Sequence, residues 1–228
     1  MNLSTLKKNA GFSLLELMIT MTIMLVAMGI ISSLMYRAFG VRTRQSRTTD
    51  ALTSAQAALN VISRELANSG FGMYENADTK LAHNGIVIAD SDSHRIRFRA
   101  NLDNAGGVPG APAASSLVIN ASGEDVTYFF DASTSSIVRY DPNGGGTDIP
   151  DTSVIVNRIS NVTFKYYDFV GVSSEATGPL STPTADTGRV TITIEVELEP
   201  VAGQPDNQQI KLSSDITLRN NSYMLQQY

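Results

Sequence analysis

The chain has 228 residues, a formal net charge of −5, and neither cysteine nor tryptophan. The absence of cysteine excludes a disulfide framework, a thiolate metal site, an iron–sulfur cluster and a cysteine nucleophile. Residues 51–228 carry 11 basic and 20 acidic side chains, a balance of −9. An acidic domain repels phosphates, so we do not expect this part of the chain to bind nucleic acid unaided.

A single long apolar run lies near the start of the chain. The 19 residues from Leu17 to Met35 include no charged side chain. As a helix they measure about 28 Å, close to the ~30 Å hydrocarbon core of a bilayer. A cleaved secretory signal is the alternative, but its apolar core is shorter, about 7–15 residues, and ends at an A-x-A site that is not found here. The sequence therefore predicts a single-pass membrane segment.

The residues directly before this run form a distinctive string, KKNAGFSLLEL at positions 7–17. A glutamate within a membrane helix costs about 2.5–3.5 kcal/mol at the bilayer centre and less toward an edge, so Glu16 is predicted to be functional. The alternative is that Glu16 merely lies at the headgroup level of an ordinary anchor. The whole string resembles the class III signal of type IV prepilins and pseudopilins.

The resemblance implies a specific role for each position of the string. Lys7 and Lys8 would be the leader charges, and a membrane peptidase would cut after Gly11 and methylate the new amino terminus of Phe12. Glu16 would be the assembly residue. A carboxylate at that position can neutralise the terminal amine of an adjacent subunit, and such a pair at low dielectric sets register more than it adds stability.

Orientation and partners follow from the resemblance. Counting basic residues would put the carboxyl side of the run in the cytoplasm, because four arginines follow it. The resemblance implies the reverse, an inner-membrane protein with a periplasmic globular domain that later joins a pilus or pseudopilus. The implied partners are the prepilin peptidase, the inner-membrane assembly platform, and other major and minor pilins.

The helix is predicted to continue well past the apolar run, since no proline occurs before Pro109. Its later part has one apolar stripe at spacings of three and four residues, formed by Leu52, Ala55, Leu59, Ile62 and Leu66. Ser69 and Gly70 mark its end. We therefore expect a leader at 1–11, a transmembrane and polymerisation helix at 12–36, an amphipathic continuation at 37–70, and a β-rich pilin domain at 71–228.

The β-rich part is recognised by short apolar runs between Gly, Pro, Asn, Ser and Asp. Long surface loops are expected at 104–116, 143–152 and 173–188, and a turn at 203–207. The fold class predicted is α+β, with a long amino-terminal helix packed on an antiparallel sheet. The predicted strands are 85–89, 95–100, 117–120, 126–130, 137–140, 154–157, 162–169, 189–199 and 210–219.

Motifs of catalysis are missing from the sequence. There is no phosphate-binding loop, zinc-protease or serine-hydrolase motif, and His83 and His94, which lack metal-ligand spacing, are interpreted as surface residues. Asp141, Asn143 and Asp148 are a weak calcium candidate, but the EF-hand register fails and a solvated turn is the better interpretation. We expect neither an enzyme nor a cofactor.

Two further segments extend the resemblance. Residues 61–71 are similar to the helix end of PilW-like minor pilins, and residues 162–168 resemble a strand of these proteins and of J-type pseudopilins. Many major pilins have a proline in the first helix and a carboxy-terminal cysteine pair, both missing here. The preferred hypothesis is a minor pilin of the initiating or tip complex. A J-like minor pseudopilin of type II secretion and an anchored ligand-binding protein that never polymerises are the alternatives.

Overall fold

The computed structural model describes residues 13–73, 83–103, 118–169, 176–198, 209–221 and 224. These residues contain one long helix, a single 3₁₀ turn and eight strands. In chain order the elements are α1 (Leu14–Leu66), η1 (Ile88–Asp90), β1 (Arg95–Arg99), β2 (Asp125–Asp131), β3 (Ser136–Asp141), β4 (Asp151–Asn157), β5 (Asn161–Phe169), β6 (Ala176–Leu180), β7 (Thr187–Glu197) and β8 (Gln209–Thr217).

The chain divides into two compact units, Met1–Arg47 and Thr48–Tyr228. In the first unit the described residues belong almost entirely to α1, which continues into the second unit as far as Leu66. The second unit holds all the strands and the core.

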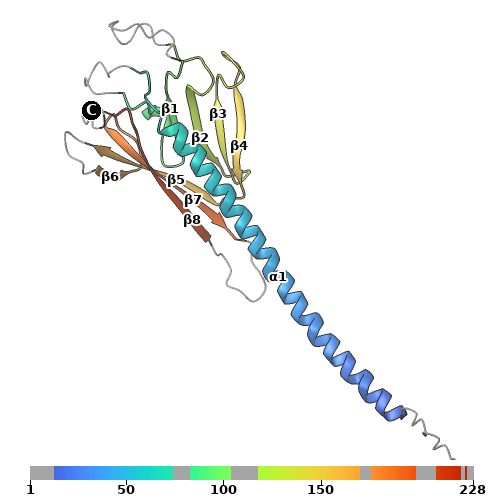
Figure 1. The fold of residues 1–228 in the computed structure, drawn as a ribbon. Helices are drawn as coiled ribbons and strands as arrows, with labels where there is room; N and C mark the ends of the chain where they lie inside the picture. The colour runs from blue at the N-terminus through green and yellow to red at the C-terminus, as the bar shows by residue number, and fades with distance from the viewer. Residues whose placement is uncertain are drawn as a thin grey trace, which may run out of the picture. The chain divides into compact units, whose positions relative to one another are not determined.

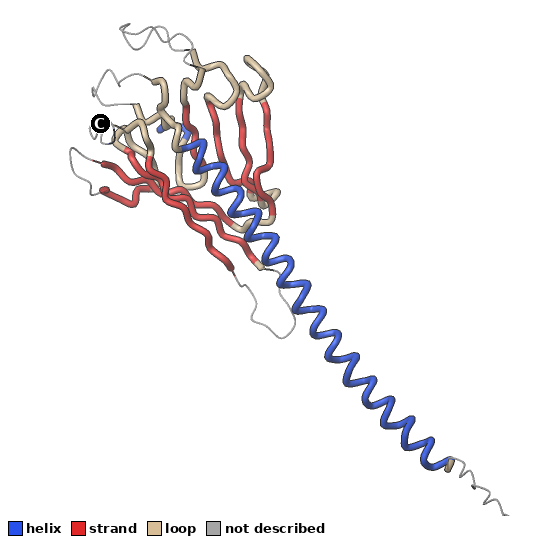
Figure 2. The backbone as a smooth tube through the Cα atoms, viewed as in Figure 1, coloured by secondary structure: helices blue, strands red, loops and turns tan. Residues whose placement is uncertain are grey.

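The strands of the second unit form two antiparallel sheets (Figures 1 and 2). Sheet A has the order β1-β2-β3-β4, and sheet B has the order β6-β5-β7-β8. The prediction of an α+β fold with antiparallel strands is confirmed, but there are two sheets where one was expected. The chain leaves sheet A at Arg158, which is left-handed (φ 60°), and the amide of Ser160 then donates to the carbonyl of Glu195 in β7 (2.8 Å).

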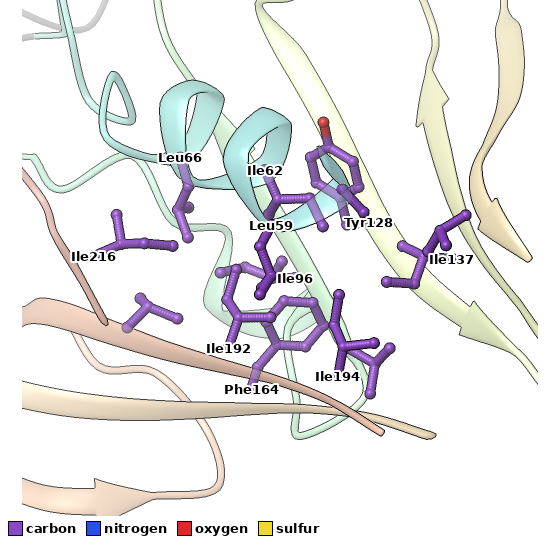
Figure 3. Close-up of a cluster of buried hydrophobic side chains, with 14 of the residues drawn as sticks. Leu59, Ile62, Leu66, Ile96, Tyr128, Ile137, Phe164, Ile192, Ile194 and Ile216 are labelled. Carbon is purple, nitrogen blue, oxygen red and sulfur yellow. The ribbon is translucent and has the colours of Figure 1, made fainter. Parts of the chain in front are cut away.

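The last turns of α1 pack against both sheets in one core (Figure 3). Four residues of the predicted stripe are completely buried there, Ala55, Leu59, Ile62 and Leu66, together with Ala58, which the stripe did not include. Leu52 is half-buried at the edge of the core, where it lines an open groove with Leu212 of β8. The buried residues of α1 share this core with Ile96, Tyr128 and Ile137 of sheet A and with Phe164, Ile192 and Ile194 of sheet B.

The helix α1 ends at Leu66, before the predicted end at Ser69 and Gly70, and turn residues continue from it to Gly70. Gly70 is left-handed (φ 77°), and its amide donates to the carbonyl of Arg99 at the end of β1 (2.8 Å). A Cβ at position 70 would lie 2.1 Å from the carbonyl oxygen of His83. A residue with a side chain therefore cannot take this place without moving the backbone.

Six predicted strands are confirmed with small shifts at their ends, and two are wrong. In 85–89 there is an isolated bridge between Ile86 and Phe98 followed by η1, because Gly85 is left-handed (φ 78°) and turns the chain away. In 117–120 the described residues, 118–120, form no strand, since the amide of Asn120 donates to the carboxylate of Glu124 (3.1 Å).

The ninth predicted strand, 210–219, is confirmed as β8, which begins at Gln209 and ends two residues earlier than predicted, at Thr217. The predicted loop 173–188 is wrong in part, because it contains β6 and the first residues of β7. The predicted loop 143–152 ends earlier, where β4 begins at Asp151. The loop 104–116 and the turn 203–207 lie outside the described residues.

Candidate assembly helix

The first unit presents apolar side chains on every side of α1. Leu14 is 77% exposed, Leu25 69% and Met35 54%. The most apolar window of the helix has a mean hydropathy of 2.3, and none of it is buried within the chain. By length and composition α1 can cross a membrane, and its exposed surface needs either lipid or other helices around it.

The two threonine hydroxyls near the start of α1 are satisfied within the helix. Thr20 Oγ1 donates to the carbonyl of Leu17 (2.9 Å), and Thr22 Oγ1 donates to that of Met18 (2.8 Å). A hydroxyl that bonds to its own helix does not carry an unsatisfied donor into lipid. These two residues are therefore compatible with a membrane segment.

Glu16 lies exposed in the first turn of α1, where the helix dipole favours a negative charge. It is the sole charged residue between positions 13 and 36. Among the described residues, none forms an ion pair or hydrogen bond with its carboxylate. A carboxylate on an apolar helix surface is costly in lipid unless another group pairs with it.

The other predicted leader residues, Lys7, Lys8, Gly11 and Phe12, lie outside the described residues. Past the apolar run, α1 carries Arg37, Arg42, Arg44 and Arg47. Arg44 is half-buried, and the other three are exposed. Sequence reasoning singled out these arginines for their effect on orientation alone.

In the second unit the end of α1 is attached to sheet A by a charged network. The carboxylate of Glu65 accepts hydrogen bonds from the hydroxyl of Tyr128 (2.7 Å) and from Nε of Arg139 (3.1 Å). Burial and the neighbouring Glu65 carboxylate raise the pKa of Tyr128, so its hydroxyl stays protonated as the donor. Glu65 was noted as part of a sequence similarity, but its partners on sheet A could not be predicted.

The calcium candidate is held together by its own hydrogen bonds. Asp141 is fully buried, and its carboxylate accepts from the amides of Asn143 (2.9 Å) and Gly123 (2.7 Å), with Arg139 Nη2 at 3.3 Å. The side-chain oxygen of Asn143 accepts from the amide of Asp148 (3.0 Å). The interpretation as a solvated turn is wrong for Asp141 and Asn143, which are buried. No group of three acidic, histidine or cysteine residues suited to a metal occurs in the described part of the chain.

The two histidines differ in their surroundings. His94 is exposed, as predicted, and contacts Ser93. His83 is half-buried, and its Nδ1 accepts a hydrogen bond from the amide of Gly85 (3.0 Å). Burial and the charge of Arg99 lower the pKa of His83, which favours the neutral ring that this acceptor role requires.

A second polar cluster, on the outer side of sheet A, was missed. Asp125 of β2 is 8% exposed and binds two arginines of β1, Arg97 through Nε (2.8 Å) and Arg99 through Nε (2.9 Å). Arg97 also contacts Asp90 of η1 at 2.5 Å. The segment 95–100 was predicted as a strand, but its partner strand and the carboxylate of Asp125 were not identifiable from sequence.

One family model matches the chain, the prokaryotic N-terminal methylation motif, over residues 6–32. The match covers the two leader lysines, the predicted cleavage site, Glu16 and most of the apolar run. No curated protein matches the chain. The chain therefore carries the leader and helix start of the type IV pilin and pseudopilin family.

The matched motif has consequences for processing and location. The leader motif implies processing by a prepilin peptidase and assembly with other pilins. Together with the exposed apolar part of α1, it fits anchoring in the inner membrane followed by assembly into a filament.

Proposed function

We propose that this chain is a minor pilin-like subunit of a type IV pilus, of the PilW-like kind, placed in the initiating or tip complex. It is cut after Gly11, methylated on Phe12, and extracted from the membrane into the filament through α1. The observation that supports this most is the methylation motif on a helix that exposes apolar side chains all round and one carboxylate, Glu16, in its first turn. Its function is assembly, not catalysis.

The proposed chemistry concerns two charges. Cleavage creates a cationic amine on Phe12 among apolar helices, and Glu16 of a neighbouring subunit neutralises it. In a low dielectric either charge is costly alone and tolerated when paired. The pair therefore selects the axial position at which subunits add, while the apolar surface of α1 provides the contact area.

The test compares Glu16→Gln with Asp50→Asn in cells. Both variants neutralise one acidic residue exposed on α1, but Asp50 lies beyond the apolar run. We expect Glu16→Gln to reduce the amount of this subunit in sheared filaments at least tenfold while its amount in the membrane stays constant, and Asp50→Asn to behave as wild type. Equal incorporation of Glu16→Gln would contradict the proposal.

A minor pseudopilin of type II secretion is the second candidate, because pseudopilins carry the same methylation motif. The two candidates differ in the major subunit beside which this chain lies. Site-specific cross-linking from an exposed position on α1 such as Leu25, followed by mass spectrometry of the adduct, identifies that neighbour. A major pilin supports the first candidate and a major pseudopilin supports the second.

A further inference from the structure

The strand β8 forms one outer edge of sheet B, and one side of it is open (Figure 1). It pairs with β7 over nine consecutive residues, from Gln209 to Thr217, without a register shift. Within the described residues no strand pairs with its other side. A regular edge of this length presents backbone amides and carbonyls with which another chain can pair.

The other three sheet edges in the described part of the chain are each protected against such pairing. β1 has only five residues, and the amide of Val87 donates to the carbonyl of Arg97 across its outer side (2.8 Å). β4 pairs with β3 through a register shift next to Val138, and β6 has both a register shift and a proline, Pro179. Native proteins block edge pairing by these same means. β8 contains no proline, glycine or register shift, so it is the edge best suited to pairing.

The backbone groups of alternate β8 residues point away from β7. The amide of Leu218 donates to the carbonyl of Gly188 (2.8 Å), and the register of β7 and β8 continues from this pair. In an antiparallel pair, every second residue makes both of its backbone hydrogen bonds to the partner strand, and the residues between them direct theirs outward. The outward-facing amides and carbonyls of β8 are therefore those of Lys211, Ser213 and Asp215.

A groove lies beside β8 on the side of the sheet that faces the core. It is lined by Leu212 of β8 and by one face of α1, namely Leu52, Thr53, Gln56, Ala57 and Asn60. Strands in a sheet are about 4.7–4.9 Å apart, so a strand paired with the open side of β8 would place every second side chain on the same side as Leu212, next to this groove. Small apolar or hydroxyl side chains fit it best, because Leu52 and Ala57 are apolar while Gln56 and Asn60 carry amides.

The opposite, solvent-facing side of β8 carries one residue of each charge. The ammonium of Lys211 lies 2.6 Å from the carboxylate of Glu195 in β7, and the carboxylate of Asp215 accepts from the hydroxyl of Thr191. Residues directly opposite each other on paired strands interact, and like charges there are unfavourable. An added strand is therefore favoured when it has an acidic residue opposite Lys211 and a basic residue opposite Asp215.

We propose that β8 accepts an antiparallel strand from an adjacent pilin-family subunit, so that the two globular domains join edge to edge. Every strand pair of sheet B is antiparallel, and antiparallel pairing is slightly the more stable kind. α1 forms one wall of the groove, and the methylation motif at its start implies assembly with other pilins. A subunit that packs along this part of α1 therefore comes within reach of β8.

The consequence is a fixed orientation of neighbouring domains. Apolar contacts along α1 are non-directional, whereas backbone hydrogen bonds between strands fix both register and direction. The inference rests on the proposed function, since a chain that never assembles has no such neighbour.

The experiment places a photoreactive amino acid at Thr217, an exposed position at the end of β8, in cells that assemble the filament. Mass spectrometry then identifies the adduct. We expect the cross-linked peptide to belong to a strand of another pilin-family subunit. Ser213→Pro, which removes an outward amide, should lower the yield of this adduct at least fivefold. The matched control Ser213→Ala keeps the amide and should leave the yield unchanged.

Two further measurements separate pairing from folding and from assembly. Urea titration tests whether Ser213→Pro keeps sheet B folded, as expected for an amide that does not bond to β7. The charge reversal K211E/D215K leaves every backbone amide in place and should also lower the yield. A wild-type chain that cross-links to a pilin from Leu25 but gives no adduct from Thr217 would overturn this proposal and leave the assembly function intact. An adduct with a protein outside the pilin family, or equal yields from Ser213→Pro and Ser213→Ala, would also overturn it.

Discussion

The hydroxyl of Tyr128 donates a 2.7 Å hydrogen bond to the carboxylate of Glu65 and so joins the second strand of sheet A to the last turn of α1. A carboxylate near the carboxyl end of a helix is unfavourable, because the helix dipole is negative there. Arg139, 3.1 Å away in β3, offsets this with its positive charge. The contact therefore attaches sheet A to the last turn of α1, the helix through which the proposed assembly occurs.

Removing that hydroxyl should destabilise the second unit. We expect Tyr128→Phe to lower its free energy of unfolding by about 1–2 kcal/mol, since a hydrogen bond to a charged acceptor is lost from a buried site. The matched control is Tyr140→Phe, whose side chain is exposed and whose effect should stay below about 0.5 kcal/mol. Urea titration in mild detergent, followed by tyrosine circular dichroism, measures both. Equal effects would show that the Glu65 contact adds no stability.

High pH should unfold this unit through two buried tyrosines. Burial, with the carboxylate of Glu65 nearby, raises the pKa of Tyr128, and burial raises that of Tyr166, whose hydroxyl donates to the carbonyl of Asp92 (2.8 Å). A raised folded-state pKa means that the stability is complete below the unfolded value of about 10 and is lost above it. The free energy of unfolding should therefore fall from about pH 10 upward. Tyr166→Phe and Tyr128→Phe should each flatten this decline, and an unchanged slope would contradict the assignment.

At low pH the critical group should be Asp125. Burial opposes its ionisation, but hydrogen bonds and charge from Arg97 and Arg99 outweigh burial and hold the pKa of Asp125 below its usual range. The stability from a lowered carboxylate pKa is present above about pH 4 and is lost as the pH falls through the folded-state value. Asp125→Asn should cost about 2 kcal/mol at neutral pH and reduce the further loss on acidification. Asp151→Asn, at an exposed position, is the control and should behave as wild type at both pH values.

The helix end should tolerate no side chain. Gly70→Ala places a Cβ 2.1 Å from the carbonyl oxygen of His83 at a left-handed position, so we expect a loss of about 3 kcal/mol or more. At Gly40, also on α1, a Cβ meets nothing within 4 Å. Gly40→Ala should leave the unfolding of the second unit within about 0.5 kcal/mol of wild type. The comparison uses the same urea titration, and a mild effect of Gly70→Ala would show that the backbone relaxes.

Periodic segments explain why much of the fold could be predicted. The stripe from Ala55 to Leu66 repeats every three or four residues, and β7 alternates from Val190 to Val196 between core and surface. In both segments one side of the helix or strand is buried, and the spacing of apolar residues in the sequence shows which side. The strand β6 was missed because Ala176–Leu180 contains glycine and proline and shows no alternation. It is an edge strand, paired with β5 alone.

Contacts between distant residues could not be predicted. In sheet B, β5 pairs with β7, although β6 lies between them in the sequence. No local sequence pattern specifies that pairing. Glu124 illustrates the same limit at a single residue. Its buried carboxylate accepts hydrogen bonds from four backbone amides, those of Leu102, Asp103, Asn120 and Ala121, although the sequence predicted a strand at 117–120.

The first part of α1, by contrast, was predicted mainly from the sequence. The leader motif and the apolar run were recognised from sequence because each is a continuous segment of the chain and depends on no contact with distant residues. The structure adds that the most apolar window of α1 is not buried within the described chain and that the hydroxyls of Thr20 and Thr22 are satisfied within α1.

The most direct test of the account is the intact mass and amino-terminal sequence of the chain purified from its native membrane. The account predicts a mature chain that begins with methylated Phe12, the product of cleavage after Gly11. A chain that still begins at Met1 in cells with active prepilin peptidase would contradict it and favour an anchored protein that does not polymerise.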